Sequence, residues 1–132
     1  YIIETAAGRL KVWINDDGLI FMEQNKPSFF DIISNERLVR CFHPLSLDER
    51  FPVRIVSTGL RDIIMPISAP NVLETMVPDF NEISILSKEM KCIGIHCFAL
   101  TESDIDNAST AVCRNFAPLY GINEEAATPI AP

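Results

Sequence analysis

The sequence lacks the motifs of the common nucleotide and metal enzymes. It contains no GxGxxG or GxxxxGK[ST] loop, no HExxH pair and no GxSxG turn, so dinucleotide, P-loop, metallopeptidase and serine-hydrolase functions lose their usual sequence support. Histidine is scarce, because His43 and His96 are the only two. His96 stands in a strand-like run, where a structural role outweighs catalysis, and His43 precedes a proline in an irregular stretch.

Positive charge is also scarce. Eleven Lys and Arg residues face 18 Asp and Glu, which gives a net charge of -7. An acidic surface repels phosphate backbones and anionic lipids, and no apolar run reaches the length of a membrane-spanning helix. We therefore expect no nucleic-acid partner and no membrane association.

The four cysteines do not form a metal-binding or redox motif. Cys41, Cys92, Cys97 and Cys113 include no CxxC pair, and no histidine stands at zinc-ligand spacing from them. Free cysteines are commonly buried as small apolar side chains. The sequence predicts reduced thiols in the core of a cytoplasmic protein and no metal site.

The 132 residues, 48% of them hydrophobic, suffice for one ordinary domain with a sizeable core. In residues 1–43, the aliphatic residues Leu10, Val12 and Ile14 occupy every second position before an "NDDG" turn. This pattern predicts a β-hairpin. A short helix with Ser34 or Asn35 as N-cap should follow. The proline-flanked stretch 44–52 breaks the periodicity and is predicted to connect two domains.

Residues 53–132 are predicted to hold more strands than helices. Strands are expected at "VRIVSTG", "RDIIMPIS", "CIGIHCFAL" and "TAVCRNFAP", the last two separated by the polar turn "TESDIDNAS". Pro70 can begin a short helix, and Asp79 with Glu82 forms a capping-box-like start for a longer one. Most strands are neighbours in sequence, so the pattern favours an α+β fold of antiparallel sheets, each packed against a helix, over a parallel α/β fold.

The last residues, "GINEEAATPIAP", have the composition of an anion-binding loop. An acid followed by small residues at a helix start can present unpaired backbone N–H groups to a ligand. On the residues alone, an acidic pair near a chain end is more often a solvated tail.

Three segments taken in order, "VSTGLRDIIMPI", "CFALTESD" and "CRNFAPLYGINEEAAT", resemble the PhzF-like (phenazine biosynthesis) family of isomerases. "IIETAAGRLKV" is similar to a hairpin that the family carries earlier. The resemblance implies a diaminopimelate epimerase-like fold, in which two similar lobes each curl an antiparallel sheet around a helix and the active site lies between them. It also implies proton transfer by a carboxylate on a small carboxylated metabolite, without metal, nucleotide or pyridoxal cofactor.

The resemblance assigns site residues one by one. Glu125 falls where the family has the aspartate of its "EDPATGS" run, and it is the predicted catalytic carboxylate. Ala127 and Thr128 match that run, whereas Pro129 and Ile130 replace Gly and Ser or Thr, and a proline has no N–H to donate. The predicted substrate-binding residues are Ala127, Thr128, Ser57, Thr58, Gly59 and Arg114.

Other roles remain open for some of these residues. Arg114 could bind a substrate carboxylate, although a structural ion pair is the commoner outcome for an arginine. The Ser57–Gly59 segment either lines the cleft or only forms a tight turn.

The family's catalytic glutamate and a nearby histidine belong to a segment with no counterpart in this sequence. We therefore expect the chain to correspond to the middle of a family member, with residues 1–43 in one incomplete lobe and 53–132 in another. Open sheet edges would favour a homo-oligomer. The alternative function is a non-catalytic module for oligomerisation or binding.

Overall fold

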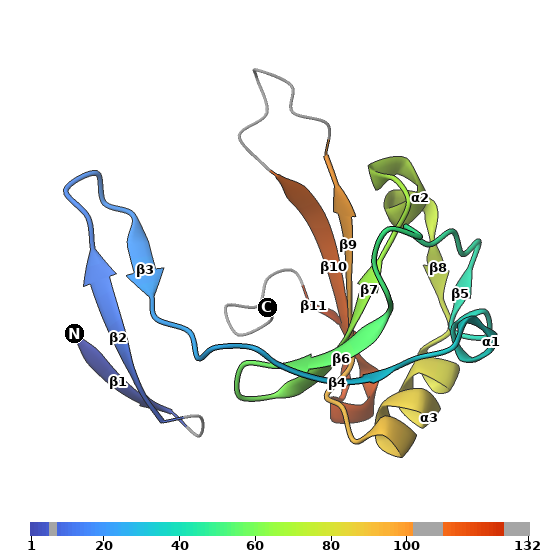
Figure 1. The fold of residues 1–132 in the computed structure, drawn as a ribbon, viewed down its shortest axis with the longest axis horizontal. Coiled ribbons are helices and arrows are strands. Elements are labelled where there is room, and N and C mark those ends of the chain that lie inside the picture. Colours follow the sequence, from blue (N-terminus) through green and yellow to red (C-terminus); the bar gives the residue numbers. More distant parts are fainter. Residues whose placement is uncertain (6–7, 102–109, 126–132) are drawn as a thin grey trace.

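The computed structural model describes residues 1–5, 8–101 and 110–125 (Figure 1). Within them, a three-stranded sheet contains β1 (Ile2–Thr5), β2 (Gly8–Ile14) and β3 (Ile20–Met22). A six-stranded sheet has the order β11 (Ile122–Glu125), β10 (Ala111–Ala117), β9 (Ile95–Leu100), β7 (Arg61–Pro66), β6 (Arg54–Ser57), β4 (Ser28–Ile32). A two-stranded sheet pairs β5 (Phe42–His43) with β8 (Val77–Pro78), and the helices are α1 (Asn35–Leu38), α2 (Pro70–Thr75), α3 (Phe80–Met90) and the 3₁₀ turn η1 (Pro118–Tyr120).

The predicted N-terminal hairpin is present as β2 and β3. Asn15 and Leu19 close its turn through a backbone hydrogen bond of 2.9 Å, and Gly18 supplies the positive φ of 83° that the turn needs. Trp13 and Phe21, paired across the two strands, stack with ring centroids 5.9 Å apart. In Figure 1 this small sheet stands apart from the larger one.

The six-stranded sheet confirms the predicted α+β class and differs from it at one strand pair. Its pairs are antiparallel apart from β7 and β9, which run parallel with Ile63 opposite Ile95. The reason is the crossover, because α2, β8 and α3 lie between these strands in the chain and return it to the same end of the sheet. The strand β4 was missing from the sequence-based prediction.

The core lies between one face of this sheet and the helices. Ile63, Ile95 and Phe116 are fully buried from the sheet side, and Ile83 and Leu86 of α3 are buried against them in one cluster. Burying a side chain of this size contributes about 1.5–3 kcal/mol. Since the side chains of a strand alternate, the residues next to Ile63, Ile95 and Phe116 in each strand point to the opposite face of the sheet.

The longer helix begins where Asp79 and Glu82 predicted it. The Asp79 carboxylate accepts hydrogen bonds from the backbone N–H groups of Asn81 and Glu82, at 3.0 and 3.1 Å. The Asp79 N–H donates to the Cys41 carbonyl at 2.7 Å. The helix start is thus fixed to the segment that leads into β5.

Residues 28–43 contribute a strand to the larger sheet and side chains to its core. β4 pairs with β6, and Leu38 and Phe42 lie in the same core cluster as Ile63. Residues 44–52 contain a bridge from Leu47 to Ile67. The assignment of residues 1–43 and 53–132 to different lobes stays a prediction. In the described part of the chain, no helix combines the length and apolar character needed to cross a membrane.

Gly94, just before β9, allows β9 and β10 to approach closely. A Cβ at this position would lie 2.0 Å from the Phe116 carbonyl oxygen and 3.0 Å from the Ala117 Cα. These are backbone atoms of a buried strand, so they cannot move aside without opening the sheet. The glycine therefore fixes the strand spacing beside the candidate site.

Gly94→Ala should destabilise the protein by about 3 kcal/mol through this overlap. Gly18→Ala is the matched control, because a Cβ there meets nothing within 4 Å and strains only the backbone, at a cost of about 1 kcal/mol. Urea unfolding of both variants measures the difference. Equal losses would contradict the steric role of Gly94.

Candidate active site

Glu125, the predicted catalytic carboxylate, is the last residue of β11. It pairs with Asn115 of β10, whose amide Nδ2 donates to the Glu125 Oε2 at 3.2 Å. The sequence placed Glu125 in a loop that leads to a helix start. The structure places Glu125 in a strand, because the chain turns at Gly121, in a left-handed conformation with a φ of 80°, and residues 122–125 return alongside β10. The expected helix start falls outside the described residues.

Four polar side chains share the face of the sheet opposite the helices. Asn115 lies between His96 and Glu125 in the antiparallel ladder, and Asp62 lies one residue before the core residue Ile63. Strand alternation therefore puts all four side chains on one face. Asp62, His96 and Asn115 are each only 8% exposed, so this face is polar and sheltered.

Burial changes the ionisation of Asp62. Desolvation, together with the negative charge of Glu125, raises the pKa of Asp62 from 3.8 to about 6, while a hydrogen bond with the Gly94 backbone opposes the rise. A carboxyl group with a pKa near neutrality can hold or release a proton under physiological conditions.

The surroundings of His96 favour its neutral form. Burial lowers the pKa of the imidazole, and the neighbouring Asn115 amide offsets part of that effect. Among the described residues, neither the His96 Nδ1 nor the Asn115 Oδ1 has a hydrogen-bond partner. Buried polar atoms are nearly always paired, and here the partner is either the neighbouring side chain of the His96–Asn115 pair or a water molecule.

Arg114 points to the other face, toward the helices. Its Nε and Nη2 donate to the two Glu124 carboxylate oxygens at 2.8 and 3.1 Å, and its Nη1 donates to the Leu73 and Met76 carbonyls at 2.8 and 2.6 Å. The ion pair raises the pKa of Arg114 and lowers the pKa of Glu124. Arg114 therefore fastens β10 and β11 to the end of α2, and its predicted contact with substrate stays a prediction.

Ser57, Thr58 and Gly59 form the turn between β6 and β7. The Ser57 Oγ accepts the Gly59 N–H at 3.1 Å, and Ser57 pairs with Arg61, so the turn lies at the end of the sheet where Asp62 stands. Their predicted binding role stays a prediction. Ala127 and Thr128 lie outside the described residues.

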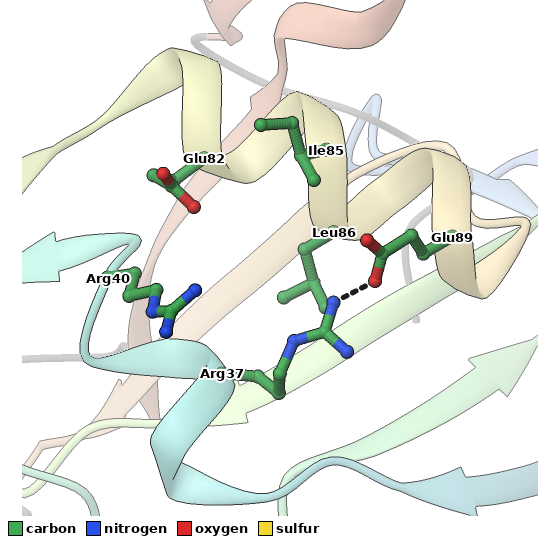
Figure 2. Close-up of a pocket in the computed structure, with 6 residues that line it drawn as sticks. All are labelled: Arg37, Arg40, Glu82, Ile85, Leu86 and Glu89. Carbon is green, nitrogen blue, oxygen red and sulfur yellow. Dashed lines mark hydrogen bonds and ion pairs between the residues drawn. The ribbon is translucent and has the colours of Figure 1, made fainter.

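A cavity of about 300 Å³ lies between α1 and α3, away from these residues. Figure 2 shows that Arg37 and Arg40 face Glu82 and Glu89 across it, and Arg37 forms an ion pair with Glu89. The two arginines and the two glutamates that line this cavity balance each other in charge. A second cavity, of about 280 Å³, borders Arg114 between α2 and β10.

Two of the residues on this face, Asp62 and Asn115, carry a signal in the sequence. In "RDIIMPI" and "CRNFAP", Asp62 and Asn115 occupy positions that alternate with apolar core residues, which is the pattern of a strand with one polar face. Which strands are neighbours was not visible in the sequence. In the described part of the chain, no group of three His, Cys, Asp or Glu side chains could hold a metal ion.

Comparisons with known proteins agree with the resemblance. The model of the phenazine biosynthesis-like protein family matches residues 1–131. An uncharacterized isomerase of Clostridium acetobutylicum is 35% identical over 133 residues, covering 95% of this chain and 43% of its own length. The uncharacterized isomerase YddE of Escherichia coli K12 is 27% identical over 130 residues, covering 92% of this chain and 42% of its own.

The crystal structure of the Bacillus anthracis phenazine biosynthesis protein, PhzF family, superposes with a TM-score of 0.77 at 30% identity. The match covers 98% of this chain and 45% of that one. The chain thus spans less than half the length of these relatives.

Asp62→Asn should make the stability of the protein less dependent on pH. A raised pKa means that folded Asp62 binds its proton more tightly than the unfolded chain does, so stability is lost as the pH rises from about 4 through about 6. The neutral amide avoids this loss, and the variant should gain about 1–3 kcal/mol at pH 8 relative to its difference from wild type at pH 4. Urea unfolding between these pH values tests it.

Asp48→Asn is the matched control with the opposite sign. Arg50, whose Nε lies 2.9 Å from the Asp48 Oδ1, lowers the pKa of Asp48. Its stabilising contribution is present above the unfolded pKa and disappears as the pH falls. Identical pH profiles for the two variants would contradict the assignment of Asp62.

Proposed function

The chain belongs to the phenazine biosynthesis-like protein family, and we propose on that premise that it acts as a PhzF-like isomerase on a small carboxylated metabolite. The reaction would be proton transfer at carbon, beside a conjugated acid, by a carboxylate. The observation that carries the proposal is the position of Glu125. By its resemblance to the family's "EDPATGS" run, this residue falls where the family has an aspartate, and it lies on a sheltered polar face with Asp62, His96 and Asn115.

In this proposal Glu125 exchanges the proton. Its carboxylate is oriented by the Asn115 amide at 3.2 Å, and proton transfer requires a base held within hydrogen-bond distance of the reacting group. Glutamate extends the carboxyl group by one carbon beyond the family's aspartate. Because shifts of about 1 Å affect catalysis strongly, the substrate would be seated differently from that of the aspartate-containing members.

The substrate's carboxylate would be held by backbone N–H groups and by a cation. We assign this role to Ala127 and Thr128, to the Ser57–Gly59 turn and to Arg114, as the family resemblance implies. Arg114 already binds Glu124. To reach a substrate directly, it would have to exchange one of its present partners.

We also propose a cytoplasmic, cofactor-independent homo-oligomer without nucleic-acid or membrane partners. The net charge of -7 supports the exclusion of nucleic acid and anionic lipid. The edge strand β4 supports self-association, because Phe29 and Ile32 are 60% and 64% exposed there and exposed apolar edges pair readily.

Solvent exchange at carbon tests the function without knowledge of the substrate. The protein is incubated in D₂O with a panel of small unsaturated hydroxy and amino acids, and proton NMR follows deuterium incorporation beside the conjugated acid. Glu125→Gln should lower the exchange rate by about 100-fold or more, since general acid–base catalysis contributes on that scale.

Glu49→Gln serves as the control, because Glu49 is an exposed residue of the connector between β5 and β6. It should exchange like the wild type. Exchange that survives Glu125→Gln unchanged would refute the role of Glu125.

A further inference from the structure

Two buried polar side chains lie in line with Glu125 across the sheet. His96 of β9 is opposite Asn115 of β10, and Asn115 is opposite Glu125 of β11. We propose that His96 is a positioning residue for the proposed reaction: its ring Nδ1–H donates to the Asn115 Oδ1 and so keeps the Asn115 Nδ2 directed at Glu125. The catalytic part of this inference rests on the proposed function, whereas the His96–Asn115 bond is a property of the folded chain.

His96 and Asn115 present complementary polar atoms to each other. The His96 Nδ1 and the Asn115 Oδ1 are buried and have no other hydrogen-bond partner among the described residues. Directly opposed residues of antiparallel strands have Cβ atoms about 4.5–5.5 Å apart, so a ring N–H of one side chain can reach an amide oxygen of the other. Both side chains are more than nine-tenths buried, where an unpaired donor or acceptor costs free energy. The two atoms therefore satisfy each other.

The amide of Asn115 presents its oxygen to His96 and its nitrogen to Glu125. The Asn115 Nδ2 donates to the Glu125 Oε2 at 3.2 Å, and the Oδ1 on the other arm of the planar amide points back toward β9, on the far side of β10 from β11. The ionisation of His96 agrees with this direction. Burial lowers the pKa of His96, and a hydrogen bond with Asn115 opposes that shift, as an acceptor does because it favours the protonated ring.

His96 matters most when Glu125 carries a proton. A protonated carboxyl group is itself a donor, and it would attract the Asn115 oxygen in place of the nitrogen. The amide has nearly the same shape in both orientations, so packing does not prevent its reversal. The His96 N–H does, because a reversed amide would place its own N–H groups against that donor. Asn115 therefore remains a donor toward Glu125, and the proton on Glu125 stays available for return to carbon.

Packing of the core does not explain why these two residues are polar. The core lies on the other face of the sheet, where Ile95 and Phe116 are buried. Ile64, which is opposite His96 on the side away from Glu125, is apolar. A polar side chain at a sheltered position costs free energy unless it is hydrogen-bonded. Polar residues thus occupy the two positions of this row that lead to Glu125.

Nitrogen-15 NMR of the histidine rings tests the bond in the free protein. The chain contains only His43 and His96, and His43, which is exposed in β5, supplies the reference in the same spectrum. We expect the neutral His96 ring to carry its proton on Nδ1. This proton should exchange with solvent about fivefold more slowly in the wild type than in Asn115→Leu, as expected for one ordinary hydrogen bond. A ring protonated on Nε2 alone, or an exchange rate that Asn115→Leu leaves unchanged, overturns the inference.

The D₂O exchange assay tests the positioning role. His96→Leu should lower kcat about fivefold or more with KM unchanged, because it removes a hydrogen bond that orients the base and no contact with the substrate. His96→Asn should restore most of the rate, since its amide N–H can take the place of the ring Nδ1–H. His43→Leu is the matched control and should exchange like the wild type. Urea unfolding checks that each variant is folded.

A double-mutant cycle shows whether His96 acts through Asn115. In the Asn115→Leu background, His96→Leu should change the rate by less than about twofold, because the residue through which it acts is already absent. A full further loss in that background, or a loss in His96→Leu that His96→Asn does not recover, overturns the positioning role. If the wild type exchanges no acid of the panel while the His96 ring proton behaves as expected, the proposed function fails and the His96–Asn115 bond stands.

Discussion

Side-chain alternation along β7, β9 and β10 is the constraint on which the rest of the structure depends. It directs Ile63, Ile95 and Phe116 into the helix-covered core, and it directs the residues next to them to the other face. A shift of register by one residue would exchange the two sets and bury Asp62 among the helices. The apolar core and the polar site are therefore specified by the same strand pairing.

Two close contacts hold this pairing in place. Gly94 permits β9 and β10 to approach at a point where any larger residue would meet the Phe116 carbonyl. On the core side, Arg114 joins Glu124 of β11 to the Leu73 and Met76 carbonyls of the α2 segment. The position of Glu125 follows from that anchor, because it is the next residue along β11 and points the opposite way.

Local signals in the sequence predicted the hairpin at the "NDDG" turn, the capped start of α3 and the strands β6, β7, β9 and β10. They could not predict the parallel pairing of β7 with β9, because that pairing depends on how the α2–α3 crossover returns to the sheet. Glu125 was identified through family resemblance alone. Asp62, His96 and Asn115 were missed as a group, since they come together only when non-adjacent strands pair.

The central claim is that Asn115 joins His96 and Glu125 on the face of the sheet away from the helices. Nuclear Overhauser contacts of the Asn115 side-chain amide protons measure this directly. We expect contacts to the Glu125 side chain and to the His96 ring. Contacts to Leu73 and Met76 on the helix side, with none to Glu125, would contradict it.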